Sequence, residues 1–354
     1  METVLSPKSA WLAFLFLVPC LGAWEWFWRS EGWPARLDDN KHLYAETRAK
    51  VDHLGSDDYV LIGSSRVLFD FQLDEWESVT GHRPVQLAVA GGSPMPVFQD
   101  LVDNSDFKGT IIFGVTPGLF FRAVGPGIGP WDHSADWIRH YHNRTYAQRF
   151  THWVGKPIQH TLACLENDED SFDNDLDLKT LINRIPLKGR VSVDPFFPWF
   201  QYLDDDRNLT MFEKVTEDTA YAGMIQRTWK FFVTSGPPRD SMDRIESRDK
   251  VLELLTPYLE RFKARGGRVI FVRCPSGDWL RNAERFGFPR TAYWDVLLER
   301  TGLPGYHFED YPFLNQYTTP EWSHLATPDA KQFTLDIARL MQQDGVIKQD
   351  IGND

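Results

Sequence analysis

The run Tyr59-Val-Leu-Ile-Gly63-Ser64-Ser65-Arg66 constrains the fold of this chain more than any other. Its four apolar residues are typical of a short strand buried on both faces of a parallel sheet, and the Gly-Ser-Ser after them predicts a tight turn. Such a turn leaves a serine hydroxyl at the carboxyl end of the strand, which is the edge of an open α/β sheet where ligands bind. Four further apolar runs predict strands of the same kind: Val85–Val89, Thr110–Val115, Arg268–Val272 and Tyr306–Phe308.

Helical patterns separate these runs. They cover His42–Leu54, Leu73–Thr80, Pro96–Val102 and Arg248–Ala264, and a last helix is expected with Thr327 as N-cap and Pro328 in its first position. This alternation predicts right-handed crossovers and an α/β fold, a flavodoxin-like doubly wound parallel sheet with helices on both faces.

The chain divides into four parts on this pattern. Residues 58–118 and 248–345 are expected to form the sheet domain, and residues 31–57 a linker and a first helix. Between residues 119 and 247 the pattern breaks, which predicts a large, mostly helical or irregular insertion that could lie over the site as a lid.

Residues 1–30 read as a membrane anchor. An apolar stretch from Ala10 to Trp24 follows Lys8 and precedes further tryptophans and Arg29. Its uninterrupted apolar part is shorter than the ~20 residues of a typical spanning helix, so a cleaved signal peptide remains an alternative. The interfacial tryptophans and the arginine favour an uncleaved anchor at the cell membrane, with the rest of the chain extracytoplasmic, as in a periplasm.

Composition excludes several classes of function. The 354-residue chain has a net charge of −12 and no Lys/Arg-rich run, which argues against nucleic acid as a partner. Of its three cysteines, only Cys164 and Cys274 remain as a candidate disulfide. The acidic run Glu166–Asp177 lacks the glycine and the final glutamate of an EF-hand loop. The histidines at 133, 140 and 142 have no accompanying ligand spacing, so no metal is expected.

A second motif, Glu321-Trp-Ser-His324, lies ahead of the last helix. A serine hydroxyl is a poor nucleophile until a histidine takes its proton and a third group orients that histidine. Ser65, His324 and Glu321 supply one of each, with Asp310 as the alternative acid. The sequence therefore predicts a Ser-His-Glu triad.

This order of parts resembles the SGNH (GDSL-like) hydrolase superfamily. The closer resemblance is to its membrane-anchored branch of cell-envelope acyl-transfer proteins, such as alginate O-acetylation accessory proteins and the teichoic-acid D-alanylation protein, which also carry Gly-Ser-Ser. The resemblance implies that Gly91 and Thr116 complete an oxyanion hole with the backbone N–H of Ser65. Thr116 stands where the family has asparagine, and Glu321 where it has aspartate.

The resemblance also implies the function. We expect an extracytoplasmic serine acyltransferase or esterase that acts on O-acyl groups, in particular O-acetyl groups, of a cell-envelope glycan without a cofactor. A multi-spanning membrane acyltransferase is the implied partner. Hydrolysis and transfer differ only in whether water or a sugar hydroxyl attacks the acyl-enzyme. A non-catalytic protein of the same fold, which binds a glycan or helps to assemble it, is the alternative from another class.

Overall fold

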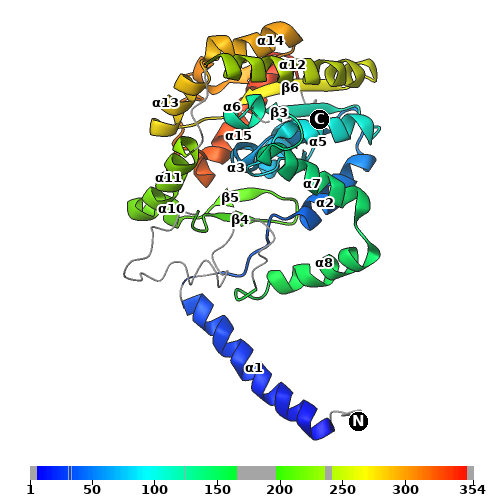
Figure 1. The fold of residues 1–354 in the computed structure, drawn as a ribbon, viewed down its shortest axis with the longest axis vertical. Helices are drawn as coiled ribbons and strands as arrows, with labels where there is room; N and C mark the ends of the chain where they lie inside the picture. Colours follow the sequence, from blue (N-terminus) through cyan, green and yellow to red (C-terminus); the bar gives the residue numbers. More distant parts are fainter. Residues whose placement is uncertain are drawn as a thin grey trace, which may run out of the picture.

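The computed structural model describes residues 6–30, 32, 34–122, 124–165, 197–235 and 241–348. Five parallel strands form its central sheet in the order β2-β1-β3-β6-β7 (Figure 1). The strands are β1 (Tyr59–Ile62), β2 (Val85–Gln86), β3 (Thr110–Gly114), β6 (Arg268–Arg273) and β7 (Gly305–His307). Because β1 and β3 are neighbours and winding reverses between them, their carboxyl ends form the topological switch point. The predicted α/β sheet is confirmed.

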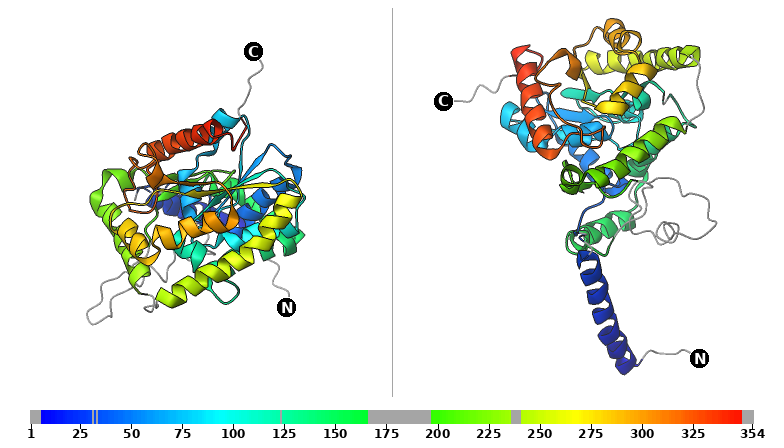
Figure 2. Two further views of the ribbon diagram at one scale, coloured as in Figure 1. Left: turned by 90° about the horizontal axis from the view of Figure 1, so that it is seen from above. Right: turned by 90° about the vertical axis from the view of Figure 1, so that its left-hand side faces the viewer.

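Alternate residues of each strand point into two separate cores. Val60 and Ile62 of β1 lie in one core, and Tyr59 and Leu61 lie in the other. Helices cover both faces, which gives three layers (Figure 2). The first core includes α2 (Lys41–Lys50), α5 (Pro94–Asp103), α6 (Pro117–Phe121), α7 (Gly129–Asn143), α12 (Ser241–Ala264) and α14 (Trp294–Thr301). The second includes α3 (Ser65–Asp70), α4 (Leu73–Thr80), α11 (Thr219–Thr234) and α15 (Thr327–Gln343).

Several predicted boundaries are wrong by a few residues. The strand predicted over Val85–Val89 ends at Gln86, although the N–H groups of Leu87 and Val89 still donate to carbonyls of the β1 segment. The last helix is capped by Ala326 rather than Thr327, because the Thr327 hydroxyl is bonded to the backbone of Met211 instead.

The described parts of residues 119–247 are built into the domain. They supply Trp131 and Trp137 to the first core and Leu209 and Met211 to the second. They also contain an antiparallel hairpin that the sequence pattern did not predict, β4 (Gln201–Leu203) with β5 (Leu209–Met211). Their other helices are α8 (Tyr146–Gln159) and α10 (Lys214–Glu217).

Arg207, in the turn of this hairpin, fastens the segment to the edge of the sheet. Its buried guanidinium donates to the carbonyls of Gln86 and Ala88 at 3.0 and 2.8 Å and pairs with Asp39 at 2.7 Å. These carbonyls belong to the edge strand β2 and to the segment that follows it, where an unpaired backbone invites pairing with another chain. The arginine therefore protects the edge as well as anchoring the hairpin.

Helix α1 (Pro7–Ser30) extends away from the domain (Figure 1). Its 24 residues form a rod of about 36 Å, and among the described residues it is the one helix long and apolar enough to cross a membrane. It can serve as an anchor or a signal sequence. The remaining short elements are α13 (Asp278–Gly287) and the 3-10 helices η1 (Val51–His53), η2 (Arg290–Ala292) and η3 (Phe308–Asp310). All three cysteines are free, so Cys164 and Cys274 do not form the disulfide that the sequence left open.

Candidate active site

Ser65 lies at the carboxyl edge of the sheet, in the first position of α3. A Cβ on Gly63 would come within 2.3 Å of the Val67 side chain, so glycine is what permits this tight turn from β1 into the helix. The side chain of Ser65 is half-buried, and its Oγ lies 2.8 Å from Nε2 of His324. The structure thus joins the two candidate residues across 259 positions of the sequence.

The loop before α15 carries Glu321 and His324, both fully buried. Oε1 of Glu321 accepts the backbone N–H of His324 at 2.6 Å and lies 2.9 Å from its Nδ1, close enough for an ion pair but not aligned as a hydrogen bond. Trp322 between them has φ = 78°, a left-handed conformation that costs a bulky residue about 1–3 kcal/mol. Its N–H donates to the Thr319 carbonyl and its carbonyl accepts from the N–H of Gly277, both at 2.9 Å, which holds this turn.

This arrangement selects one form of the imidazole. A carboxylate only accepts hydrogen bonds, so Glu321 beside Nδ1 favours the tautomer with its proton on that nitrogen. Nε2 is then the acceptor, and the Ser65 hydroxyl donates to it. A histidine in this state can take the serine proton as the oxygen attacks.

Aromatic rings hold the His324 side chain in place. The ring of Phe69, one turn after Ser65 on α3, stacks on the imidazole with centroids 4.1 Å apart and an interplanar angle of 19°. Phe200 and Trp229 approach it at 6.0 and 5.7 Å. The Trp229 indole N–H, from α11, also donates to Oε2 of Glu321. Three aromatic residues therefore restrict the rotation of the imidazole.

Sequence reasoning missed Trp229. It lies on a helix of the segment for which no regular pattern was recognised, 92 positions from the carboxylate it contacts. No local motif marks it, because its position depends on how α11 packs against the sheet domain.

Gly91 and Thr116 follow β2 and β3 at the same edge. The Val89 N–H donates to the Gly63 carbonyl at 3.1 Å. This bond ties the segment just before Gly91 to the turn that carries Ser65. Gly91 has φ = 66°, a conformation that glycine adopts without strain. The Thr116 hydroxyl lies 2.6 Å from the hydroxyl of Ser64, the residue before the candidate nucleophile.

A buried cluster of charges lies behind the serine. Arg66 pairs with Glu284 of α13 at 2.6 Å, and Glu284 also pairs with Arg273 at the end of β6 at 2.5 Å. Burial alone would raise the pKa of the Glu284 carboxyl, but the two arginines lower it to about 2. This geometry gives Arg66 the role of a structural ion pair behind the serine.

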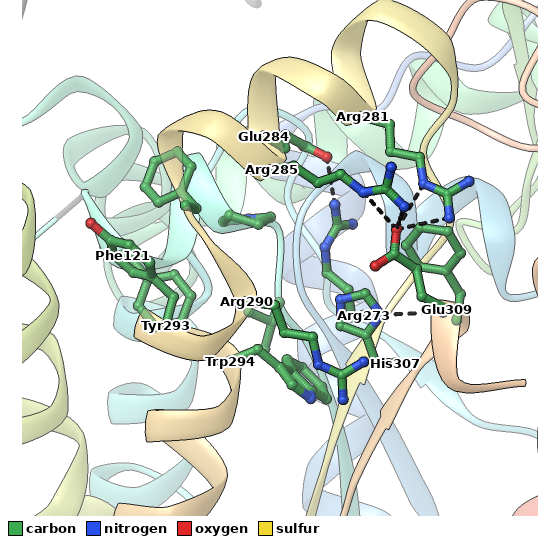
Figure 3. Close-up of a pocket in the computed structure, with 14 residues that line it drawn as sticks. Phe121, Arg273, Arg281, Glu284, Arg285, Arg290, Tyr293, Trp294, His307 and Glu309 are labelled. Carbon is green, nitrogen blue, oxygen red and sulfur yellow. Dashed lines mark hydrogen bonds and ion pairs between the residues drawn. The ribbon is translucent and has the colours of Figure 1, made fainter.

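A pocket opens on the other side of Glu284, between α13 and the ends of β6 and β7 (Figure 3). Four arginines line it, and each is paired with a carboxylate: Arg273 with Glu284, Arg281 and Arg285 with Glu309, and Arg290 with Asp310. The lining includes none of Ser65, Glu321 and His324. Asp310, the alternative acid, is therefore engaged with Arg290, and the carboxylate beside His324 is that of Glu321.

A further buried carboxyl, Asp70, supports the late loop from α3. Its Oδ1 accepts the backbone N–H of Leu325, directly after His324, at 3.0 Å. Burial raises the pKa of Asp70 well above its usual range, and the neighbouring Cys274 thiol, also buried, has a raised pKa as well. The sequence did not single out Asp70, and it singled out Cys274 only as a candidate for a disulfide.

The histidines considered as metal ligands have other partners. His140 lies 3.0 Å from the ring nitrogen of His42, and His142 contacts the Asp100 carboxylate at 2.5 Å. Within the described ranges, no group of three or more His, Cys, Asp or Glu is arranged to hold a metal ion. The run Glu166–Asp177 lies outside the described residues.

No protein-family model matches the chain, and a search of curated proteins finds no match either.

Proposed function

We propose that this protein is a serine acyltransferase or esterase of the SGNH type that works through Ser65, His324 and Glu321. The observation that carries the proposal is the line of contacts from Ser65 Oγ to His324 Nε2, at 2.8 Å, and from His324 Nδ1 to Glu321 Oε1, at 2.9 Å. The strand order supports it, because the serine follows β1, a glycine-rich turn follows β2, and the histidine precedes the last helix.

The chemistry has two halves. Ser65 Oγ attacks the acyl carbonyl carbon while Nε2 of His324 takes its proton, and the oxyanion that forms is met by the backbone N–H groups of Ser65 and Gly91 and by Thr116. His324 then returns the proton to the leaving alcohol, and the acyl group remains on Ser65. In the second half His324 deprotonates water or a sugar hydroxyl, which takes the acyl group and restores the serine.

The proposed substrate is an O-acyl group, in particular O-acetyl, on a cell-envelope glycan. This part depends on the sequence resemblance and on α1, which would keep the domain on the extracytoplasmic side of the cell membrane beside a multi-spanning acyltransferase. Two half-buried tryptophans support a sugar ligand. Trp322, between Glu321 and His324, lies 5.7 Å from Trp279 between ring centroids, and aromatic faces commonly line ligand sites.

Two observations favour a second candidate, a non-catalytic glycan-binding protein of the same fold. The Thr116 hydroxyl is engaged with Ser64, and Glu321 is not aligned as a hydrogen-bond acceptor for Nδ1. Both weaken the catalytic arrangement. The Nδ1 and Oε1 atoms are nevertheless only 2.9 Å apart, and catalytic hydrogen bonds often become aligned when substrate binds, so we favour the enzyme.

The test is turnover of p-nitrophenyl acetate by the full chain, combined with mass-spectrometric mapping of the residue that reacts with a fluorophosphonate. We expect Ser65→Ala to abolish both turnover and labelling. Ser64→Ala, the matched control, keeps the nucleophile and should remain labelled at Ser65. Equal turnover in the Ser65→Ala protein would favour the non-catalytic candidate. For an active enzyme, release of acetate in the presence of a glycan acceptor distinguishes hydrolysis from transfer.

A further inference from the structure

Helix α8 exposes its apolar face to the surroundings and turns its polar face towards the domain. Tyr146, Phe150 and Trp153 form a stripe at i, i+4 and i+7, and their exposed fractions are 88%, 63% and 71%. None of the residues of α8 is buried. A surface helix of a globular domain normally turns such a stripe towards the core. The stripe on α8 faces outward instead.

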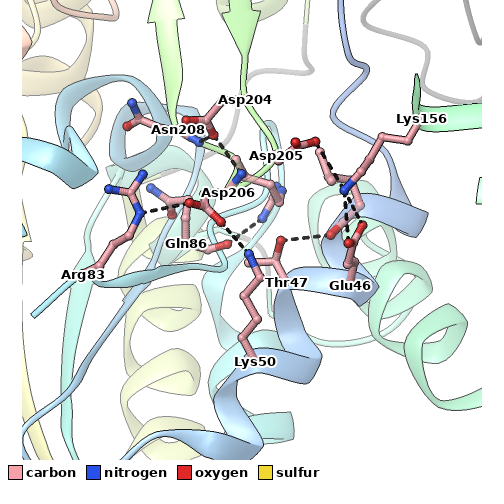
Figure 4. A network of polar contacts seen from close by, with 12 residues as sticks. Glu46, Thr47, Lys50, Arg83, Gln86, Lys156, Asp204, Asp205, Asp206 and Asn208 are labelled. Atoms are coloured by element: carbon pink, nitrogen blue, oxygen red, sulfur yellow. Dashed lines mark hydrogen bonds and ion pairs between the residues drawn. The ribbon is translucent and has the colours of Figure 1, made fainter. Parts of the chain in front are cut away.

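Polar contacts fix the opposite face of α8 to the domain. Lys156 contacts Glu46 of α2 at 3.1 Å and Asp205 of the β4–β5 turn at 3.3 Å (Figure 4). His152 contacts Glu46 at 3.0 Å, and His160 contacts Asp205 at 3.1 Å. The bond from His152 and the pair with Lys156 lower the pKa of Glu46 to about 2, so the carboxylate is charged at neutral pH. The outward direction of the stripe is therefore set by ion pairs.

The end of α8 is attached to the end of α1. Arg29 donates to the Thr161 carbonyl at 2.8 Å, and the N–H groups of Ala163 and Cys164 donate to the Glu25 carboxylate at 3.0 and 2.9 Å. Figure 1 and the right-hand view of Figure 2 show α8 beside the point where α1 leaves the domain. If α1 crosses a bilayer, α8 lies at the level of its surface.

We propose that α8 lies flat in the membrane–water interface, with its apolar stripe inserted into the bilayer that α1 crosses. The inference rests on the membrane attachment proposed above. Aromatic residues gather at this level on both helices, since Trp24 and Trp26 of α1 are 47% and 71% exposed, and tryptophan and tyrosine are enriched where a chain passes through headgroups. Arg149 is exposed next to Phe150, where a cation can meet lipid phosphate.

Continuity with α1 favours lipid over a protein partner as the occupant. Residues 161–164, directly after α8, are bonded to the end of α1, so one bilayer can cover both the apolar surface of α1 and the stripe without a second molecule. An interfacial helix of this kind buries its apolar face by about 5–10 Å. Together, α1 and α8 would hold the domain in one orientation relative to the membrane, whereas α1 alone would let that orientation vary.

The test uses the full chain in phosphatidylcholine/phosphatidylglycerol vesicles, with Cys20→Ser and Cys164→Ser to remove the accessible thiols. A nitrobenzoxadiazole label is placed on Trp153→Cys. The matched control is Phe286→Cys, which replaces another exposed aromatic (83%) on α13, far from α1 (Figure 1). We expect doxyl-labelled lipid to lower the emission of the label at position 153 about twofold or more, given that insertion depth, and to leave the control unchanged.

Three outcomes would overturn the inference. If iodide in the buffer quenches position 153 as it does position 286, the stripe faces water. If neither iodide nor doxyl lipid quenches position 153, a second copy or another protein covers the stripe. If the chain does not remain with the vesicles, α1 is not an anchor. Ester turnover is measured on the same samples. If Ser65 is the nucleophile, turnover persists in all three outcomes, so a failure of the membrane inference is distinguished from a failure of the proposed chemistry.

Discussion

Replacing Glu321 by glutamine tests the most specific part of the proposed triad. The carboxylate is surrounded by donors, because Oε1 faces the backbone N–H and Nδ1 of His324 while Oε2 accepts the indole N–H of Trp229. Glutamine has one acceptor oxygen and one NH2 group. Its NH2 must therefore face a donor on one side or the other.

The two orientations of the substituted amide have different costs. With the amide nitrogen towards His324, the imidazole is driven to the tautomer with its proton on Nε2, which cannot accept from Ser65. With the amide nitrogen towards Trp229, the buried indole N–H loses its acceptor, which costs about 1–3 kcal/mol of stability. Loss of the orienting acid lowers turnover by about 10⁴-fold in serine proteases, equivalent to roughly 5 kcal/mol of transition-state stabilisation.

In either orientation the neutral amide no longer stabilises the imidazolium that forms on His324, so we expect Glu321→Gln to lower kcat for p-nitrophenyl acetate by about 10³–10⁴-fold, with a modest decrease in Tm. Asp310→Asn is the matched control, since it removes another carboxylate of the late segment that is paired with Arg290. If Glu321→Gln is as active as the parent and Asp310→Asn is inactive, the acid is misassigned. If neither change matters while Ser65 still reacts, the enzyme works with a Ser-His dyad, and the account of what orients His324 is wrong.

Three other substitutions test the surroundings of the site. Trp229→Phe keeps an aromatic ring but removes a donor from Glu321, so it should lower the free energy of unfolding in urea by about 1.5–3 kcal/mol and lower kcat. An unchanged kcat would show that α11 does not position Glu321. Burial raises the pKa of Asp70, so the folded state binds its proton more tightly than the unfolded state, and parent stability should fall as pH rises above about 4. Asp70→Asn should remove that fall, and identical stability curves at pH 5 and 8 would contradict the assignment. Glu284 has its pKa lowered from 4.5 to about 2, so it stabilises the protein above pH 4.5, and the gain is lost as pH falls from 4.5 to 2. Glu284→Gln should reduce this acid dependence and, because it leaves Arg66 without its buried partner, cost about 3–5 kcal/mol at pH 7 by urea unfolding; a loss below 1 kcal/mol would contradict it.

The sheet could be predicted because its central strands are unambiguous. β1, β3 and β6 are apolar on both faces, and the runs that predict them are continuous. β2 was overestimated, because Leu87 to Val89 are equally apolar and buried but lie beside the sheet without extending the strand. Apolar runs report burial, and burial does not require a strand.

The residues of the candidate site also differ in whether the sequence predicts them. Ser65, Glu321 and His324 are marked by their place after a strand or before a helix, so motif and order suffice to suggest them. Trp229 has no such marker, because its contact arises from tertiary packing. The short hairpin around Arg207 was hidden for a related reason, since its strands have only three residues each and leave no recognisable alternation.

The position of β3 in the sheet has a consequence for how the protein is made. β3 and β6 are paired neighbours, yet roughly 150 residues separate them in the sequence, so at about 5–20 residues per second β6 emerges on the order of 10 s after β3. Throughout that time one side of β3 is an unpaired apolar edge, open to pairing with other chains. Biogenesis of this protein should therefore depend on a chaperone that shields the first half of the sheet, and slowing synthesis between residues 115 and 267 should increase aggregation while leaving the stability of the finished protein unchanged.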